Sequence, residues 1–279
     1  MRNTMKTFPK DTLVKWIKEL GLDMVGVADP KYYENIDPQW NPLSILPTCK
    51  SIIVFAREIP RSHFRGIEDG TVFNRVKRFI GADEPYQICR RFEDNGFLAV
   101  PCTLLAQERW PDGIGKPGKP APNVAIDPKL AAQLAGLGEI GYNGTFITPQ
   151  FGPRQALGVI LCDAQMEADQ PFVPNTLCDR SKCKECVKAC PAKALTEKTI
   201  TIDIGGHPTT IAVFNESACK FCPNGAYPDT SCETAPPNRI AAACTRACIA
   251  CLEDSGKVKT NFKKPFRRRT PWAFDIFQA

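Results

Sequence analysis

The sequence predicts a mixed α/β (α+β) protein that consists of two parts. Helix-like and strand-like segments alternate over about the first 165 residues, which is typical of a layered core of helices on a sheet. Beyond residue 170, cysteine, proline and lysine become frequent and long apolar runs become rare. Ten of the 14 cysteines lie between Cys178 and Cys251. We therefore expect one domain over residues 1–170 and a smaller, cysteine-rich domain over residues 171–279.

The helices of the first domain are predicted from apolar residues that recur every three or four positions. Leu13 and Ile17 lie on one face of a helix over Asp11–Leu20. Asp11 is placed to cap its N-terminus, and Gly21 stands where a helix ends. Further helices are expected over Phe73–Ile80, Pro85–Asn95 and Lys129–Gly136.

Strands are predicted from short apolar runs that are rich in β-branched residues and bounded by turn-forming or charged residues. The acidic stretch Asp163–Pro174, which contains prolines, follows the last of these runs and is expected to be a linker. The runs are Met24–Ala28, Ser51–Ala56, Phe97–Pro101, Thr145–Thr148 and Ala156–Cys162.

The overall composition narrows the class of protein. A hydrophobic content of 43% suffices for a globular core, and a net charge of +6 is too small to indicate nucleic-acid binding. No stretch approaches the roughly 18 uninterrupted apolar residues of a membrane span. The segment Met1–Lys10 lacks the apolar centre of a signal peptide, so we expect a reduced, cytoplasmic location.

The first cysteines of the second domain follow an informative spacing, Cys178-x4-Cys183-x2-Cys186-x3-Cys190-Pro191. Bacterial ferredoxins hold iron–sulfur clusters with thiolates at C-x2-C-x3-C-P, and the cysteine before the proline serves the other cluster of a pair. The x4 gap at the front departs from the usual x2. The pattern predicts iron–sulfur clusters with these four cysteines as ligands.

The remaining cysteines supply enough thiolates for a second cluster, because each four-iron cluster takes four. They are Cys219, Cys222, Cys232 and the run Cys244-x3-Cys248-x2-Cys251. The ligands expected for the first cluster are Cys178, Cys183, Cys186 and a cysteine of the last run, such as Cys251. The ligands expected for the second cluster are Cys190, Cys244, Cys248 and either Cys219 or Cys222.

Zinc is the main alternative metal. Thiolate pairs with C-x2-C spacing also build tetrahedral zinc sites, and Cys183 and Cys186 with Cys219 and Cys222 would form one. A disulfide framework is typical of small secreted domains, and the length of this chain disfavours it. The zinc alternative stays open on the spacing alone.

A glycine-rich loop, Gly136-Leu-Gly-Glu-Ile-Gly141, matches the dinucleotide-binding pattern G-x-G-x-x-G. That pattern requires a strand before it and a helix after it, whereas here a helix is expected before and a strand after. We therefore reject dinucleotide binding. The glycines are expected to end the helix and to allow a neighbouring strand or a flat cofactor to approach the backbone closely.

The same loop resembles a segment shared by epoxyqueuosine reductases and corrinoid reductive dehalogenases. The similar segment runs from Leu134 to Arg154 and continues over Leu157–Asp163. Glu19–Asp29 and Leu46–Phe55 are similar to the start of that superfamily, and the cysteine groups extend the likeness forward. The resemblance therefore covers most of the chain.

The resemblance implies a nitroreductase-like domain that carries a base-off corrinoid (cobalamin), followed by a ferredoxin-like domain with two 4Fe-4S clusters and a basic C-terminal tail. The clusters would pass low-potential electrons from a ferredoxin- or flavodoxin-type donor protein to cobalt, which would reduce a small organic substrate. Tyr142 would donate a proton, with a simply packed tyrosine as the alternative, and Arg154 would stabilise an anionic substrate or product. By position, the residues near the corrinoid would be Gly136, Gly138, Gly141, Asn143 and Gly144.

The chain also departs from that superfamily. Epoxyqueuosine reductases carry an acidic proton donor ahead of the glycine loop, but Asp127 is the only acid of the corresponding stretch Ala121–Pro128 and is shifted. The export signal of respiratory dehalogenases and the tRNA-binding extension of epoxyqueuosine reductases are not recognisable here. We therefore expect a different substrate. The alternative is a non-catalytic, ferredoxin-like electron carrier or a subunit of a larger redox complex.

Overall fold

The computed structural model describes residues 7–64, 80, 83–102, 124, 126–223, 225–226, 237–259 and 262–264. The expected helix over Phe73–Ile80, Cys232 and most of the basic tail lie outside the described residues, apart from Ile80 itself. The chain forms two compact units. The first unit comprises Met1–Arg57, Ile80–Leu137 and Ala156–Phe172, and the second comprises Glu58–Phe79, Gly138–Gln155 and Val173–Ala279. The second unit thus takes in two stretches, 58–79 and 138–155, that the sequence analysis assigned to the first domain.

The first unit is built on an open four-stranded sheet with the strand order β1-β2-β6-β3. β1 pairs with β2, and β3 pairs with β6, both antiparallel. All four strands were expected from the apolar runs, and their bounds are β1 Met24–Ala28, β2 Ser51–Glu58, β3 Ala99–Pro101 and β6 Gln155–Cys162.

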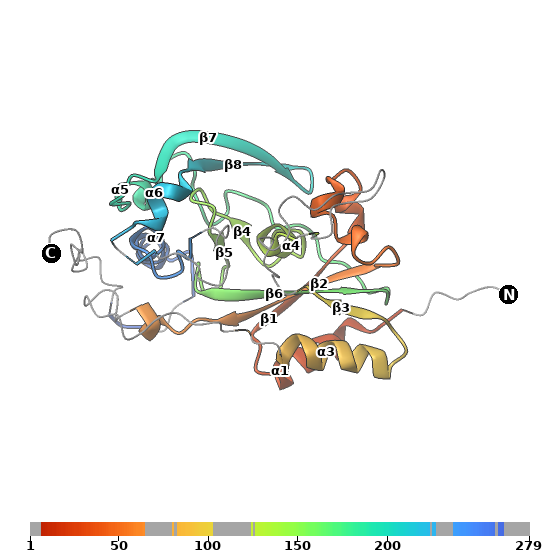
Figure 1. Ribbon diagram of the computed structural model, residues 1–279. Coiled ribbons are helices and arrows are strands. Elements are labelled where there is room, and N and C mark those ends of the chain that lie inside the picture. The colour runs from red at the N-terminus through yellow and green to blue at the C-terminus, as the bar shows by residue number, and fades with distance from the viewer. Residues whose placement is uncertain are drawn as a thin grey trace. The chain divides into compact units, whose positions relative to one another are not determined.

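Helices cover both faces of this sheet. Figure 1 shows α1 (Lys10–Glu19) and α3 (Asp83–Asp94) on one face and α4 (Pro128–Leu134) on the other. Their positions confirm three helices expected from the sequence. Four short 3-10 helices complete the connections, η1 Pro30–Tyr33, η2 Pro38–Trp40, η3 Pro42–Ser44 and η4 Arg61–Phe64, the last belonging to the second unit.

The start of α1 differs from the expectation in one detail. Pro9 is the N-cap residue, and no side chain caps the helix, so Asp11 lies in the first turn instead. There its carboxylate still faces the positive end of the helix dipole. Gly21 has a φ of 66° just beyond α1, as the sequence predicted for the end of that helix, and Gly96 has a φ of 79° just beyond α3.

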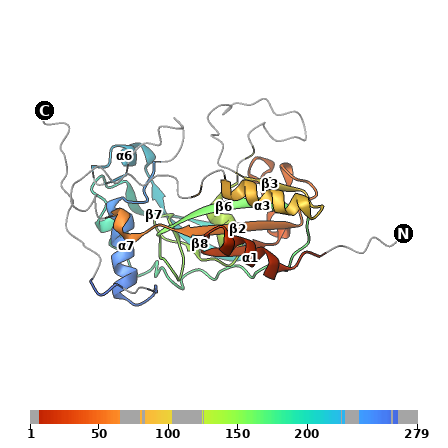
Figure 2. The same ribbon diagram turned by 90° about the horizontal axis from the view of Figure 1, so that it is seen from below.

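The core of the first unit lies between the sheet and the pair α1 and α3, which lie across the same face in Figure 2. Leu13 and Ile17 of α1 pack with Ile88 and Phe92 of α3 and with strand residues. On the opposite face, a Cβ at Gly26 would lie 2.2 Å from the carbonyl oxygen of Ala135. This glycine therefore lets the end of α4 pack directly on β1.

The stretch Asp163–Pro174 is not a free linker, which corrects the sequence-based expectation. Ala164 and Met166 are buried in the core of the first unit. Asp169 accepts a hydrogen bond of 2.8 Å from the backbone N–H of Val27 and pairs with Lys10. The segment is therefore held to the first unit by packing and by hydrogen bonds.

The described residues of the second unit form two β-hairpins and three α-helices, besides the 3-10 helix η4. β4 (Glu139–Ile140) pairs with β5 (Phe146–Ile147), where a strand was expected over Thr145–Thr148. The long hairpin of β7 (Leu195–Ile204) and β8 (His207–Phe214) was missed, although Gly205-Gly206 between alternating residues is a hairpin signal. The helices are α5 Glu185–Lys188, α6 Glu216–Lys220 and α7 Ala243–Asp254.

No helix among the described residues combines the length and the apolar character that a membrane crossing requires.

Candidate metal centre

Four cysteines of the second unit line one pocket, Cys190, Cys219, Cys222 and Cys244. Cys190 follows α5, Cys219 lies on α6 and Cys244 lies in the first turn of α7. The rest of the lining is mostly apolar and includes the guanidinium-bearing side chain of Arg239. We call these four thiols the second thiol group.

Four other thiols gather around that of the α7 residue Cys248. Its thiol interacts electrostatically with the thiols of Cys178, Cys183, Cys186 and Cys251. The Sγ atoms of Cys183 and Cys251 lie 3.6 Å apart. We call these five thiols the first thiol group. The chain segment around α5 and helix α7 therefore bring together cysteines that are up to 73 residues apart in the sequence, from Cys178 to Cys251.

The thiol of Cys248 lies in a different group from the one expected from the sequence. The sequence analysis assigned this residue to the second cluster together with Cys244, whereas its thiol lies in the first thiol group. Residues four apart on a helix are separated by about 6 Å along the axis, which is enough to reach a different group. Cys186 also interacts with Cys244, so the two groups are neighbours.

Five thiols of the two groups are strongly desolvated. Burial raises the pKa of Cys186 and of Cys219 to about 12, and it raises the pKa of Cys178, Cys244 and Cys248 as well. Without a cation these thiols stay protonated near neutral pH. A metal that binds thiolate displaces these protons and removes the cost of burying the charge.

The donor set fits iron–sulfur clusters in kind and number. All 13 described cysteines are free of disulfide bonds, and nine of them belong to the two thiol groups. Two four-iron clusters take eight thiolates. Within the described residues, no three His, Cys, Asp or Glu side chains converge as the ligands of a single metal ion do.

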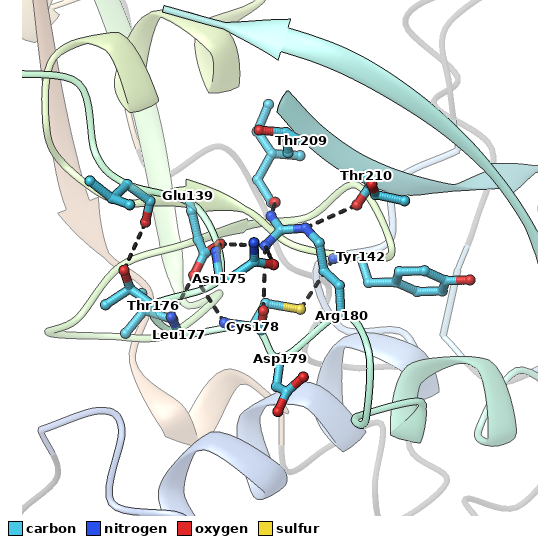
Figure 3. A network of polar contacts seen from close by, with 12 residues as sticks. Glu139, Tyr142, Asn175, Thr176, Leu177, Cys178, Asp179, Arg180, Thr209 and Thr210 are labelled. Atoms are coloured by element: carbon cyan, nitrogen blue, oxygen red, sulfur yellow. Dashed lines mark hydrogen bonds and ion pairs between the residues drawn. The ribbon is translucent and has the colours of Figure 1, made fainter. Parts of the chain in front are cut away.

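A buried ion pair lies beside the first thiol group, and the sequence analysis missed it. Glu139 and Arg180 form an ion pair of 2.7 Å, with side chains that are 0% and 6% exposed. Figure 3 shows the segment 175–180, which includes Cys178, wrapped around this pair. The only signal in the sequence is a charged residue inside the glycine-rich loop.

Tyr142 is fully packed beside the same segment. Its backbone N–H donates to Sγ of Cys178 at 3.3 Å, and its hydroxyl donates to the carbonyl oxygens of Thr196 and Glu197 at 3.5 and 3.4 Å. The ammonium group of Lys184 lies 3.4 Å from the centroid of the tyrosine ring. These contacts supply the packing role that was the alternative for Tyr142, and its role as a proton donor stays a prediction.

The glycine-rich loop forms the β4–β5 hairpin. A Cβ at Gly138 would lie 2.1 Å from the carbonyl oxygen of Ile147, and one at Gly141 would lie 2.6 Å from Cδ1 of the same residue. Gly136 has a φ of 73° and a Cβ there would lie 2.8 Å from the carbonyl oxygen of Gln170. The close approach at Gly138 and Gly141 is therefore to the neighbouring strand β5, one of the two possibilities that the sequence left open, whereas at Gly136 it is to Gln170, which lies in no strand. The helix-then-strand context is confirmed.

The tip of this hairpin holds the two other residues that the resemblance places near a corrinoid. Asn143 accepts a hydrogen bond of 3.0 Å from the backbone N–H of Thr145, while its Nδ2 is buried without a partner among the described residues. Gly144 has a φ of 74°, which favours glycine. The unpartnered amide group at Asn143 leaves a hydrogen-bond donor for a bound group. Corrinoid contact by this loop stays a prediction.

Arg154 is buried at the start of β6. Its Nη1 lies 2.6 Å from Oε1 of Glu58 and donates to the carbonyl oxygen of Ile59 at 2.9 Å. Asp127, the only acid of the stretch ahead of the glycine loop, caps α4 by accepting from the backbone N–H of Lys129. Both residues thus have structural partners, and the anion-stabilising role of Arg154 is untested.

Comparison with known proteins supports the resemblance that the glycine loop and the cysteine spacing indicated. The chain is 29% identical over 199 residues to tetrachloroethene reductive dehalogenase of Desulfitobacterium hafniense, which covers 69% of this chain and 30% of that protein. It is 33% identical over 176 residues to epoxyqueuosine reductase of Synechocystis sp., which covers 63% of this chain and 53% of that protein. The chain is a relative of both kinds of reductase. No family model matches it.

The solved structures agree at the level of the fold. A reductive dehalogenase, whose structure was described as suggesting a mechanism for B12-dependent dehalogenation, superposes with a TM-score of 0.51 at 17% identity. The match covers 84% of this chain and 30% of that chain. This chain spans about half or less of the length of the reductases that it resembles. The likeness therefore concerns the mixed α/β fold, and the activity of the whole relatives does not transfer with it.

Proposed function

We propose that the chain is an iron–sulfur redox protein whose second unit holds two 4Fe-4S clusters in a ferredoxin-like arrangement. The observation that carries the proposal is the gathering of nine buried or half-buried thiols into two neighbouring groups. The second cluster would be bound by the whole second thiol group, Cys190, Cys219, Cys222 and Cys244. The first cluster would be bound by four of the first thiol group, Cys178, Cys183, Cys186, Cys248 and Cys251.

We further propose that this protein is a corrinoid-dependent reductase that acts on a small organic substrate. The relatives are reductases, and the glycine-rich loop that resembles theirs lies in a mixed α/β fold, whose first unit we propose to be nitroreductase-like. When bound, a corrinoid would supply low-potential cobalt chemistry, which side chains alone cannot perform. By the resemblance, the residues near it would be Gly136, Gly138, Gly141, Asn143 and Gly144. The unpartnered amide donor of Asn143 supports a contact at the hairpin tip, whereas Gly136, Gly138 and Gly141 closely approach Gln170 or Ile147 of the chain itself.

The polypeptide itself would position the clusters and exclude water from them. Tyr142 and Arg154 remain the candidates for the proton donor and the anion-stabilising group. Because both side chains are buried and hydrogen-bonded, a substrate would have to replace existing bonds to use them. An electron-donor protein of the ferredoxin or flavodoxin type would reduce the clusters. A reduced compartment such as the cytoplasm suits so many free thiols.

A non-catalytic electron carrier, or a subunit of a larger redox complex, is the second candidate. The specific observation in its favour is that Asp127 caps a helix, so the stretch ahead of the glycine loop offers no free acidic donor. In this case the clusters would be present and the glycine loop would serve only as a tight hairpin.

Anaerobic purification, followed by reconstitution with iron, sulfide and a corrinoid, separates these candidates. Broad visible absorption from sulfur-to-iron charge transfer together with about one cobalt per chain would support the reductase. Iron without cobalt would favour the carrier. Zinc without iron would refute both and restore the zinc alternative.

A further inference from the structure

Glu139 and Arg180 form an ion pair that is almost completely removed from water. Charges in such a place are costly unless they are paired and their remaining hydrogen-bond positions are filled. The carboxylate of Glu139 lies on β4 inside the glycine-rich loop, and the guanidinium group of Arg180 lies two residues beyond Cys178. The pair therefore joins the β4–β5 hairpin to the segment that carries the first cysteine of the ferredoxin-like spacing.

The carboxylate organises the backbone of that segment. Oε2 of Glu139 accepts from the N–H of Asn175 at 2.8 Å. Oε1 accepts from the N–H groups of Leu177 and of Cys178, the latter at 2.9 Å. Three backbone donors thus converge on one buried carboxylate, as Figure 3 shows. An apolar pair of the same volume could not accept these hydrogen bonds.

The guanidinium group of Arg180 forms further hydrogen bonds to the segment 175–180 and to its neighbours. Its Nη1 donates to Oδ1 of Asn175 at 3.0 Å and to the carbonyl oxygen of Cys178 at 3.3 Å. Its Nε donates to the carbonyl oxygen of Thr210 at 2.9 Å, and its Nη2 donates to that of Ile140. Arg180 therefore ties the segment to both hairpins of the second unit.

Each polar atom of Cys178 has a hydrogen-bond partner within the second unit. Its N–H donates to Glu139, its carbonyl oxygen accepts from Arg180, and its Sγ accepts from the N–H of Tyr142. The first thiol group offers five thiols for the four positions of a cluster. Among these five residues, Cys178 is positioned by hydrogen bonds to Glu139, Arg180 and Tyr142, none of which lies on helix α7.

We infer that Glu139 and Arg180 are positioning residues that present the Cys178 thiolate as a ligand of the first cluster. The inference rests on the proposed iron–sulfur function. It gives the x4 spacing a physical meaning, because the gap between Cys178 and Cys183 contains Arg180, the partner of Glu139.

The test compares the variant Glu139→Gln with Cys178→Ala and with a matched control, Glu84→Gln. Glu84 pairs with Arg57 at 2.6 Å in the first unit, far in sequence from any of the nine thiols. In reconstituted protein, Glu139→Gln and Cys178→Ala should each lose about one iron per chain and show the electron paramagnetic resonance signal of a three-iron cluster. Glu84→Gln should keep the wild-type iron content and signal. Wild-type iron and an unchanged signal in Glu139→Gln would overturn the inference.

A metal-independent measurement separates failure of this inference from failure of the proposed function. In metal-free full-length protein, alkylation of Cys178 followed by mass spectrometry should be about tenfold faster in Glu139→Gln than in wild type, because local opening exposes the thiol. Equal rates would refute the positioning role, whatever metal the wild type binds. If Glu139→Gln does not accumulate, Arg180→Lys, which keeps the charge and loses the fork of donors, serves in both measurements.

Discussion

Cys244 and Cys248 lie one helical turn apart on α7, yet their thiols belong to different groups. The thiol of Cys244 interacts with Cys190 and Cys222, whereas that of Cys248 interacts with Cys178 and other members of the first thiol group. Helix α7 therefore runs past both groups and contributes to each. If two clusters are bound, this helix bridges them.

Alanine substitutions at these two positions should therefore damage different clusters. Cys244→Ala should remove the signal of the second cluster and leave that of the first, because the second thiol group has only four thiols among the described residues and a four-iron cluster takes four. Cys248→Ala should affect only the first cluster, with a smaller loss because Cys251 is near. Electron paramagnetic resonance of the reduced protein, with iron analysis, distinguishes the two. Loss of the same cluster in both variants would contradict the grouping.

Cys186→Ala should lower the iron content and the thermal stability of the second unit. Its thiol is 7% exposed, and the unit packs mostly small side chains around it, so bound metal supplies much of the folding free energy. Cys49→Ala in the first unit is the control, since it removes a buried thiol outside both groups. Iron analysis and thermal unfolding report the result, and unchanged iron in Cys186→Ala would refute the ligand assignment.

Arg239 should raise the reduction potential of the second cluster. Its guanidinium group stacks 4.3 Å from the centroid of the Phe214 ring, and its Nη1 is buried without a hydrogen-bond partner among the described residues. The same positive charge partly offsets the rise in pKa that burial causes at Cys219 and Cys244. A buried cation favours the more negative, reduced state of a cluster.

Arg239→Met should thus lower the midpoint potential of the second cluster by an amount on the order of tens of millivolts. Arg239→Lys keeps the positive charge and should therefore lower this potential much less. A redox titration followed by electron paramagnetic resonance measures both clusters at once. The potential of the first cluster is the internal control, and equal shifts in the two clusters would argue against a local effect of Arg239.

Gly138→Ala should destabilise the β4–β5 hairpin. The added methyl group would lie 2.1 Å from the carbonyl oxygen of Ile147, so the backbone must move, at a cost of about 1–3 kcal/mol. Gly206→Ala is the matched control: its φ is 85°, but no heavy atom lies within 4 Å, so only backbone strain of about 1 kcal/mol applies. Thermal unfolding compares them, and equal melting temperatures would show that the contact at Gly138 relaxes freely.

The buried thiols of the first unit should make stability fall at alkaline pH. Burial raises the pKa of Cys162 from 9.0 to about 12. The thiol then holds its proton more tightly in the folded state than in the unfolded state. Its contribution to the free energy of unfolding is therefore complete below pH 9 and is lost as the pH rises toward 12.

The free energy of unfolding should decline between about pH 9 and 12, by at most about 1.4 kcal/mol per pH unit for each such thiol. Cys162→Ala should lower stability at neutral pH but decline less steeply. Urea unfolding at several pH values measures the slope, and identical slopes for the variant and the wild type would exclude a contribution from this thiol.

Much of the first unit could be predicted because its elements have strong local signals. The β-branched run of β1 and the periodic face of α1 identify a strand and a helix without knowledge of their neighbours. The β7–β8 hairpin was missed because β7 is largely exposed and has no apolar run, and because the apolar run of β8 is only four residues long, Ile211–Phe214. The stretch Asp163–Pro174 was misjudged because its polar composition hides two buried side chains.

The sequence by itself determined the chemistry of the candidate centre, because ligand type and the C-x2-C-x3-C-P spacing are local properties of the chain. Only the tertiary structure decided which thiols lie together. Cys244 and Cys248 separate because of the rise of a helix, and Cys178 is placed by a carboxylate 39 residues earlier in the chain. Such pairings depend on contacts between distant segments, and no local pattern of residues encodes them.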